Sequence, residues 1–201
     1  MANANAPFGL MPINLDGTTW SGQGRLVHIP TSQAGNIFIG DPLIPLGTTD
    51  AFGVPEVGTA TAGATDRIVG SFLGRSNGPA GSGVTLLQSN TVYRPASISG
   101  YGLICDAQNV AYTIQEDSVG GNIPITTGGY ANGNLVAGAG GSTATGFSSW
   151  QLQSSSVATG NATYQVKVIG LLRGPDNAIG NYARWMVQLN LSALAQNTAG
   201  F

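Results

Sequence analysis

The sequence predicts an all-β fold: a sandwich or barrel of many short antiparallel strands, with an extended N-terminal arm and a glycine-rich loop region. The 31 Gly and 10 Pro residues among the 201 interrupt the chain every few residues. No stretch therefore reaches the roughly ten residues of i, i+3, i+4 periodicity that predict a helix. Short runs of β-branched and aromatic residues lie between the breaks. Many short strands joined by frequent turns are typical of sandwiches and barrels.

The strands are predicted from these runs one by one. They are Arg25–Ile29, Asn36–Ile39, Arg67–Leu73, Val84–Tyr93, Tyr101–Cys105, Val110–Glu116, Ser149–Gln153, Tyr164–Leu172 and Ala183–Leu191. The alternation is clearest in the last run, where Trp185, Val187 and Leu189 share one face and polar or long side chains share the other. Such a strand is expected to be buried on one side only.

One folded domain is expected, because a chain of this length can bury about 70% of its unfolded surface around one core. We assign residues 24–201 to this single β-rich domain. Residues 1–23 are interpreted as an extended arm, since Pro and Gly recur there among isolated large apolar residues. Residues 119–147 are dominated by Gly, Thr, Ala and Asn, so we expect loops that gain order in an assembly.

Charged residues are scarce and restrict the classes of partner. Lys and Arg total 7 and Asp and Glu total 9, so charged residues make up 8% of the chain, against about 25% in average soluble domains. Direct nucleic-acid binding is not expected, because it needs clustered cations. A membrane partner is not expected either, since no apolar run approaches the roughly 18 residues of a spanning helix. A surface rich in Gly, Ala, Ser, Thr and Asn suggests coverage by other proteins.

The chain offers little chemistry for catalysis. His28 is the only histidine, no G-x-S-x-G motif accompanies it, and a position on a strand face or in an interface is the preferred interpretation. Glu116 and Asp117 are adjacent, so in a strand they would point to opposite faces, and we expect a solvated turn there. The other carboxylates are scattered and Cys105 is alone. We therefore predict no catalytic residues, no metal and no cofactor: the chain is not expected to be an enzyme.

One turn can be assigned from its residue types. Pro175 fixes φ, while Asp176 and Asn177 can close their own backbone into a turn, with Gly180 following. This turn is expected to place strands rather than to react. At the N-terminus, the residues MANANAPFGL lack the basic and apolar regions of a signal peptide, so we expect synthesis and folding in a cytoplasm.

Five segments belong together, and their order along the chain is part of the pattern. They are Pro7–Pro12 (PFGLMP), Ile39–Leu43 (IGDPL), Ile68–Gly74 (IVGSFLG), Asp106–Gln115 (DAQNVAYTIQ) and Val168–Asn181 (VIGLLRGPDNAIGN), the last followed by the strand Ala183–Leu191. In this order they resemble segments of the head decoration, or cement, proteins of tailed bacteriophages. The sequence departs from the family pattern at Gln108, where the family has Pro, and it lacks a closing His in the last strand.

The resemblance implies a structural virion protein, a homotrimer made in the bacterial host cytoplasm and seated on the outer face of the capsid. Its partners would be the major capsid protein and other copies of itself. It would stabilise the shell by clamping neighbouring capsid subunits. The candidate capsid contacts on the arm are Pro7, Phe8, Met11 and Trp20, with the alternative that these side chains cap the core of their own domain. A tail or host-recognition protein that binds carbohydrate is the alternative function.

Overall fold

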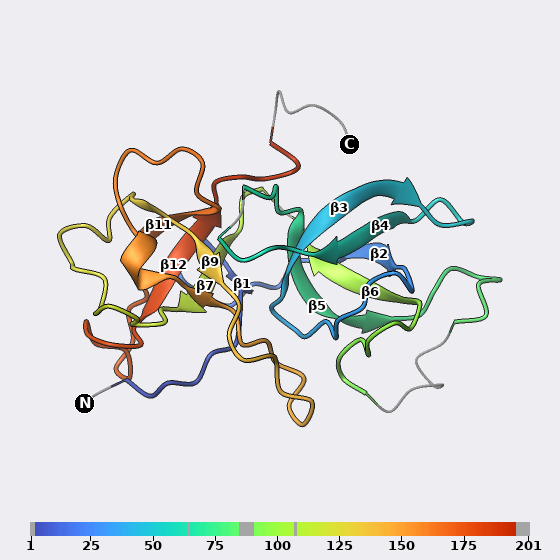
Figure 1. The fold of residues 1–201 in the computed structure, drawn as a ribbon, viewed down its shortest axis with the longest axis horizontal. Coiled ribbons are helices and arrows are strands. Elements are labelled where there is room, and N and C mark those ends of the chain that lie inside the picture. The colour runs from blue at the N-terminus through green and yellow to red at the C-terminus, as the bar shows by residue number, and fades with distance from the viewer. Residues whose placement is uncertain (1–2, 64, 85–90, 107, 196–201) are drawn as a thin grey trace.

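The computed structural model describes residues 3–63, 65–84, 91–106 and 108–195, and it confirms the all-β fold class (Figure 1). Within these residues the helical structure is a single 3-10 turn, Ser154–Ser156. The strands form two lobes that lie side by side, a closed barrel on the right of Figure 1 and an open sheet on the left.

The barrel lobe is built from five strands in the order β2-β4-β3-β5-β6. Their bounds are β2 (Arg25–Ile29), β3 (Pro42–Thr49), β4 (Pro55–Thr59), β5 (Gly70–Ser76) and β6 (Gly100–Cys105). All pairs are antiparallel except β2 and β4, which run parallel where His28 faces Glu56. Its interior is filled by apolar side chains, mainly Val27, Ile29, Ile37, Leu43, Val57, Val69, Phe72 and Ile104. Closure of the barrel leaves none of these five strands with a free edge.

The sheet lobe has five strands in the order β1-β7-β12-β11-β8, and a separate ribbon of β9 and β10. Their bounds are β1 (Met11–Ile13), β7 (Ala111–Gln115), β8 (Asn132–Gly133), β9 (Leu135–Val136), β10 (Gln151–Leu152), β11 (Val166–Leu171) and β12 (Arg184–Leu189). One face of this sheet packs on the ribbon and neighbouring loops around Tyr112, Ile114, Trp150, Trp185 and Val187. Trp185 and Val187 are buried as their alternation predicts, whereas Met186 between them is half-buried.

Residues 3–23 lie along the sheet lobe. Met11–Ile13 form its edge strand β1 and pair with β7, while the side chains of Leu10 and Ile13 are 0% and 8% exposed. The chain then turns, so that Ile13 bridges to Thr19 and Gly17 lies close to the sulfur of Met186. Part of the N-terminal segment is thus an integral element of the sheet.

The strand predictions succeed where β-branched and aromatic residues are continuous. Arg25–Ile29 coincides with β2, and the runs at Tyr101, Val110, Tyr164 and Ala183 fall on β6, β7, β11 and β12. The prediction of a strand at Asn36–Ile39 is wrong, because this run makes only isolated bridges at Ile37 and Ile39. Most of Val84–Tyr93 lies outside the described residues. β3 and β4 were not predicted, since Pro and Gly within them argue against strands.

The two lobes are joined where the N-terminal segment crosses the entry to β3. The amide of Leu10 donates to the carbonyl of Gly40 (2.8 Å), and the amide of Gly40 donates to the carbonyl of Phe72 in β5 (2.8 Å). Gly9 and Gly40 both have positive φ, +77° and +93°. A Cβ on Gly40 would overlap the carbonyl oxygen of Phe8, and one on Gly9 would overlap that of Gly40. Only glycine permits this approach of two backbones.

Asp41 follows this crossing and is buried, at 3% exposure. Its Oδ2 accepts the amide of Phe38 (2.8 Å), and it also shares a hydrogen bond with Ser148. Burial raises the pKa of Asp41 from 3.8 to about 6, with the two hydrogen bonds acting in the opposite direction. The turn before β3 thus holds a carboxyl group that is protonated more readily than usual.

Substitution at the crossing tests its geometry. Gly40→Ala should lower the free energy of unfolding by at least about 3 kcal/mol, because left-handed strain adds to a backbone overlap. Gly53→Ala is the matched control: Gly53 also has positive φ (+76°), but no atom lies within 4 Å of its Cβ position. It should cost only about 1–2 kcal/mol. Urea denaturation measures both, and equal losses would contradict the crossing as described.

Substitution of Asp41 tests its protonation. The folded-state pKa is raised, so the protonated form stabilises the fold below about pH 4, and this contribution is lost as the pH rises through about 6. Asp41→Asn mimics the protonated form. Relative to this variant, the wild-type protein should lose roughly 3 kcal/mol of unfolding free energy between pH 3.5 and pH 7. A constant difference across that range would contradict the assignment.

Candidate binding surface

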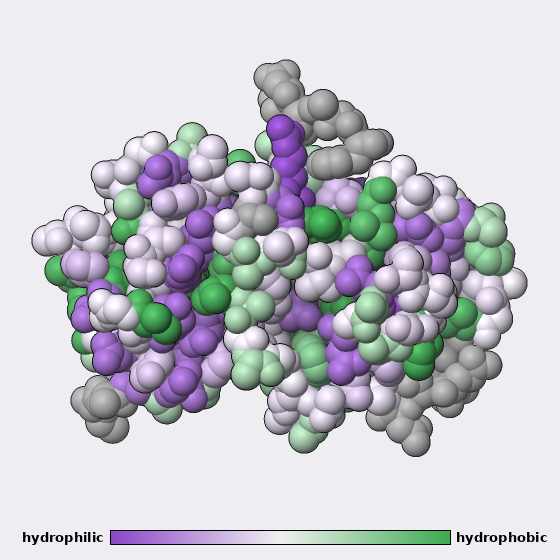
Figure 2. Space-filling view, in the orientation of Figure 1, coloured by the Kyte–Doolittle hydropathy of each residue, from purple (hydrophilic) through white to green (hydrophobic). Residues whose placement is uncertain are grey.

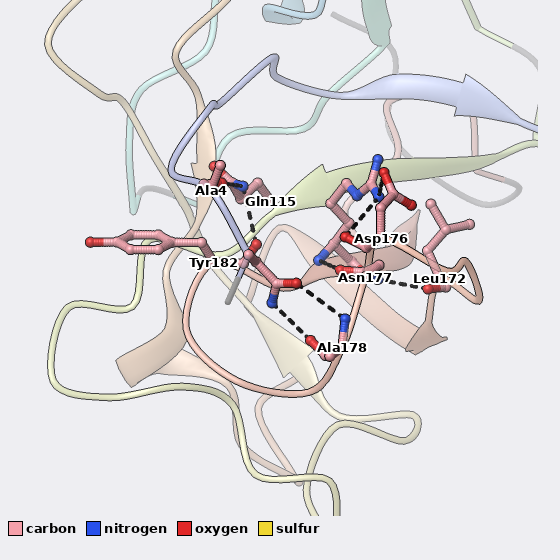
Figure 3. A network of polar contacts seen from close by, with 9 residues as sticks. Ala4, Gln115, Leu172, Asp176, Asn177, Ala178 and Tyr182 are labelled. Atoms are coloured by element: carbon pink, nitrogen blue, oxygen red, sulfur yellow. Dashed lines mark hydrogen bonds and ion pairs between the residues drawn. The ribbon is translucent and has the colours of Figure 1, made fainter. Parts of the chain in front are cut away.

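The N-terminal segment is docked on the turn between β11 and β12 (Figure 3). The Asn3 side chain donates to the carbonyls of Ala178 (2.8 Å) and Asn181 (3.0 Å) and accepts the amide of Ala178 (3.1 Å). These contacts bring together residues about 175 positions apart in the chain. In Figure 1 the N-terminal segment and this turn lie together at the left end of the sheet lobe.

Gln115 at the end of β7 anchors the same segment. Its Nε2 donates to the carbonyls of Ala4 (2.8 Å) and Tyr182 (3.1 Å), and its Oε1 accepts the amide of Ala6 (2.9 Å). The residue is 3% exposed, so these bonds satisfy an amide group that is removed from water. A neutral side chain therefore fixes both the N-terminal segment and the following turn.

The turn itself is braced by Asn177, which is 7% exposed. Its Nδ2 donates to the carbonyls of Leu172 (2.6 Å) and Arg184 (2.8 Å), and its Oδ1 accepts the amide of Arg184 (2.8 Å). Arg184 also pairs with the exposed carboxylate of Asp176 (2.7 Å), which lowers the pKa of Asp176. Pro175 is exposed and Gly180 has a φ of +144°. The turn is therefore held from inside while its outer side chains face solvent.

Two hollows, each of about 370 Å³, flank this turn. The first is lined by Asn3, Ala4, Ala6, Phe8, Gln115, Asp176, Tyr182 and Arg184. The second is lined by Ile125, Gly128, Gly129, Gly170, Leu171, Arg173, Ile179 and Trp185. We call these residues together with Tyr130 the loop surface. Its apolar members include Ile125, Ile179 and Tyr130, which are 68%, 41% and 76% exposed.

The structure separates the four candidate contact residues. Phe8 is half-buried and lines the first hollow with Asp176, and Pro7 is its half-buried neighbour. Met11 lies on β1, in register with Thr113 of β7, away from both hollows. Trp20 packs against the core of the sheet lobe and against Gly22, whose Cβ position is 2.5 Å from the indole ring. Phe8 and the predicted turn are thus brought together, whereas Met11 and Trp20 lie elsewhere.

Glu116 supports the second hollow, and the prediction that it is solvated is wrong. Its side chain is 0% exposed, and its carboxylate accepts the amide of Ile123 (3.0 Å), the indole N–H of Trp185 (3.0 Å) and the hydroxyl of Ser118 (3.2 Å). Burial raises the pKa of Glu116. Trp185 also packs against Gly128, so this carboxylate fastens the glycine-rich loop to the tryptophan under the hollow.

Sequence reasoning missed the roles of Gln115 and Glu116 because the partners of Gln115, and Trp185 among those of Glu116, are remote in the chain. The only local signal is the end of a strand that carries polar residues after apolar ones. Asp117 likewise turns to a remote partner, since its Oδ1 accepts both the amide (2.9 Å) and the hydroxyl (2.8 Å) of Ser154. The start of the glycine-rich region is therefore held by two adjacent carboxylates facing different elements.

Among the described residues, no group of three or more His, Cys, Asp and Glu side chains is arranged to hold a metal ion. The helical structure of the same residues includes no segment of the length and apolarity needed to cross a membrane. Comparison with known proteins identifies no family: no family model, no curated protein and no solved structure matches this chain.

Removal of the Glu116 carboxylate should loosen the loop surface. Glu116→Ala leaves the amide of Ile123 and the indole of Trp185 without their acceptor, so we expect a loss of about 1–3 kcal/mol in unfolding free energy. Hydrogen exchange should accelerate in residues 118–130 and stay unchanged in the barrel lobe. Glu116→Gln, which keeps an acceptor oxygen, serves as the matched control. Uniform acceleration in both lobes would contradict a local role.

Proposed function

We propose that this chain is a capsid decoration protein that binds the outer surface of a phage head through its loop surface. The observation that carries the proposal is the pair of exposed apolar side chains, Ile125 and Ile179, that line the second hollow beside the turn on which the N-terminal segment is docked. Most of the visible surface is of intermediate hydropathy, and strongly polar or apolar residues form small groups (Figure 2). Such a surface can bury itself against other proteins at little cost of desolvating charge.

The segments that carry the family resemblance also contact one another. Leu10 of the first binds Gly40 of the second, and Gly40 binds Phe72 of the third. The strand β7, in the fourth, pairs with β1 and with β12. The resemblance therefore involves the contacts that organise the fold, which is where a shared architecture would restrain sequence.

In the proposed mechanism, binding to the capsid involves no covalent reaction. Copies of the chain, associated as homotrimers, would contact several major capsid subunits at once, so that modest contacts gain strength by about 10²–10⁴ through multivalency. The working place would be the outer face of the virion, after synthesis in the bacterial cytoplasm. Because Asp176 and Arg184 of the loop surface pair with each other and leave Arg173 as its other charged residue, binding should depend weakly on salt.

Binding to bare mature heads of the parent virus, prepared without this chain, tests the proposal. Ile125→Asp places a charge at the second hollow and should raise the dissociation constant at least about tenfold, or 1.4 kcal/mol. Phe52→Asp is the matched control, since Phe52 is also exposed (49%) but belongs to the barrel lobe. It should bind as the wild-type protein does. Co-sedimentation titrations measure both; equal weakening by the two substitutions, or no binding of the wild-type protein, would contradict the proposal.

A tail or host-recognition protein that binds carbohydrate is the second candidate function. One observation favours it: Tyr130, in the glycine-rich region, presents a ring that is 76% exposed, and such rings stack on sugar faces. Glycan-array binding that is lost in Tyr130→Ala, without binding to heads, would favour this second function over the first.

A further inference from the structure

A serine, a histidine and a carboxylate are connected in series on the barrel lobe. His28 of β2 lies between Glu56 of β4 and Ser99, which directly precedes β6. Its Nδ1 is 2.9 Å from Oε1 of Glu56, and its Nε2 is 2.7 Å from the Ser99 hydroxyl. The strand pairing fixes this arrangement, because β2 has β4 and β6 as its two neighbours and His28 is in register with Glu56 and Tyr101.

The hydrogen bonds determine which imidazole nitrogen carries the proton. An ionised carboxylate only accepts, so Nδ1 of His28 must donate to Glu56. In the neutral ring Nε2 then presents its lone pair to the Ser99 hydroxyl. The second oxygen of Glu56 accepts the hydroxyl of Thr48 (2.7 Å). This bond, followed by the contact with His28, lowers the pKa of Glu56 and keeps it ionised at neutral pH.

Solvent reaches the three groups unequally. Ser99 is exposed, whereas the side chains of His28 and Glu56 are 12% and 17% exposed. The ring of Tyr101 lies 5.1 Å from the imidazole, and its hydroxyl donates to the carboxylate of Asp50. The histidine is therefore shielded and oriented beneath a hydroxyl that faces solvent.

We propose that Ser99 is a nucleophile activated by His28, with Glu56 as the positioning residue, and that it reacts with small carboxylic esters arriving from solvent. The Ser99 oxygen would attack the ester carbonyl carbon while its proton passes to Nε2 of His28. The bond to the leaving alkoxy group would then break, and His28 would return the proton to release an alcohol. Water, deprotonated by the same nitrogen, would cleave the acyl group from Ser99 as a carboxylic acid.

The activity goes beyond capsid binding and does not depend on it. His28, interpreted from the sequence as a residue of a strand face or an interface, becomes the general base of this proposal. Its partners are 28 and 71 positions away and form no local motif. Sequence reasoning could not pair them, because only closure of the barrel brings β4 and β6 to opposite sides of β2.

A fluorophosphonate probe tests the proposal directly, since an activated serine oxygen displaces fluoride at phosphorus and forms a stable adduct. Intact mass and peptide mapping should find one probe per chain, on Ser99. Ser99→Ala should abolish the adduct, and His28→Gln should slow labelling at least about 100-fold, the usual scale of a general base. Ser155→Ala, at another exposed serine, should label as the wild-type protein does.

Variants of Glu56 distinguish a residue that orients His28 for the reaction from one that only stabilises the fold. Glu56→Gln should slow labelling at least about tenfold, and Glu56→Asp should restore part of the rate, with thermal unfolding recorded for each variant. Absence of labelling in the folded wild-type protein would overturn the proposal. Labelling of Ser99 at an unchanged rate in folded His28→Gln would overturn it as well, because the hydroxyl would then need no base.

Discussion

The crossing of two backbones at Gly9 and Gly40 is the constraint on which the arrangement of the whole molecule depends. Neither residue has a side chain, so the N-terminal segment can pass over the entry to β3 and donate from Leu10 to Gly40. β1 can then pair with β7, and Leu10 enters the core of the sheet lobe. A second link between the lobes is the hydroxyl of Tyr112, which donates to the carbonyl of Cys105 (2.9 Å).

This chain holds its loops through buried neutral amides and a few buried ionisable side chains. Among the neutral amides, Gln115 and Asn177 each bind several backbone groups. Gln165 does the same: it is 0% exposed, accepts the Leu135 amide and donates to the Thr61 carbonyl (3.0 Å each). Arg94 is 1% exposed and donates to four carbonyl groups. These bonds satisfy backbone groups that are removed from water.

The all-β class and the strands rich in β-branched residues were predictable because period-two alternation is local. β3 and β4 were not, since Pro42, Pro45 and Pro55 argue against strands and only closure of the barrel pairs them. Of the candidate contact residues, Phe8 lines a hollow, but the far side of that hollow comes from β7, the turn before β12 and the start of β12. Glu116 was misplaced for the same reason: its burial depends on Trp185, 69 positions away.

In the proposed complex the loop surface, at the end of the sheet lobe, faces the shell of a phage head. Electron microscopy of bare mature heads incubated with this protein tests it most directly. The proposal predicts ordered density on the outer face of the capsid, with the residues around Ile125 and Ile179 against the major capsid subunits and the barrel lobe outward. Bare heads after incubation, or density in which the barrel lobe contacts the shell, would contradict it.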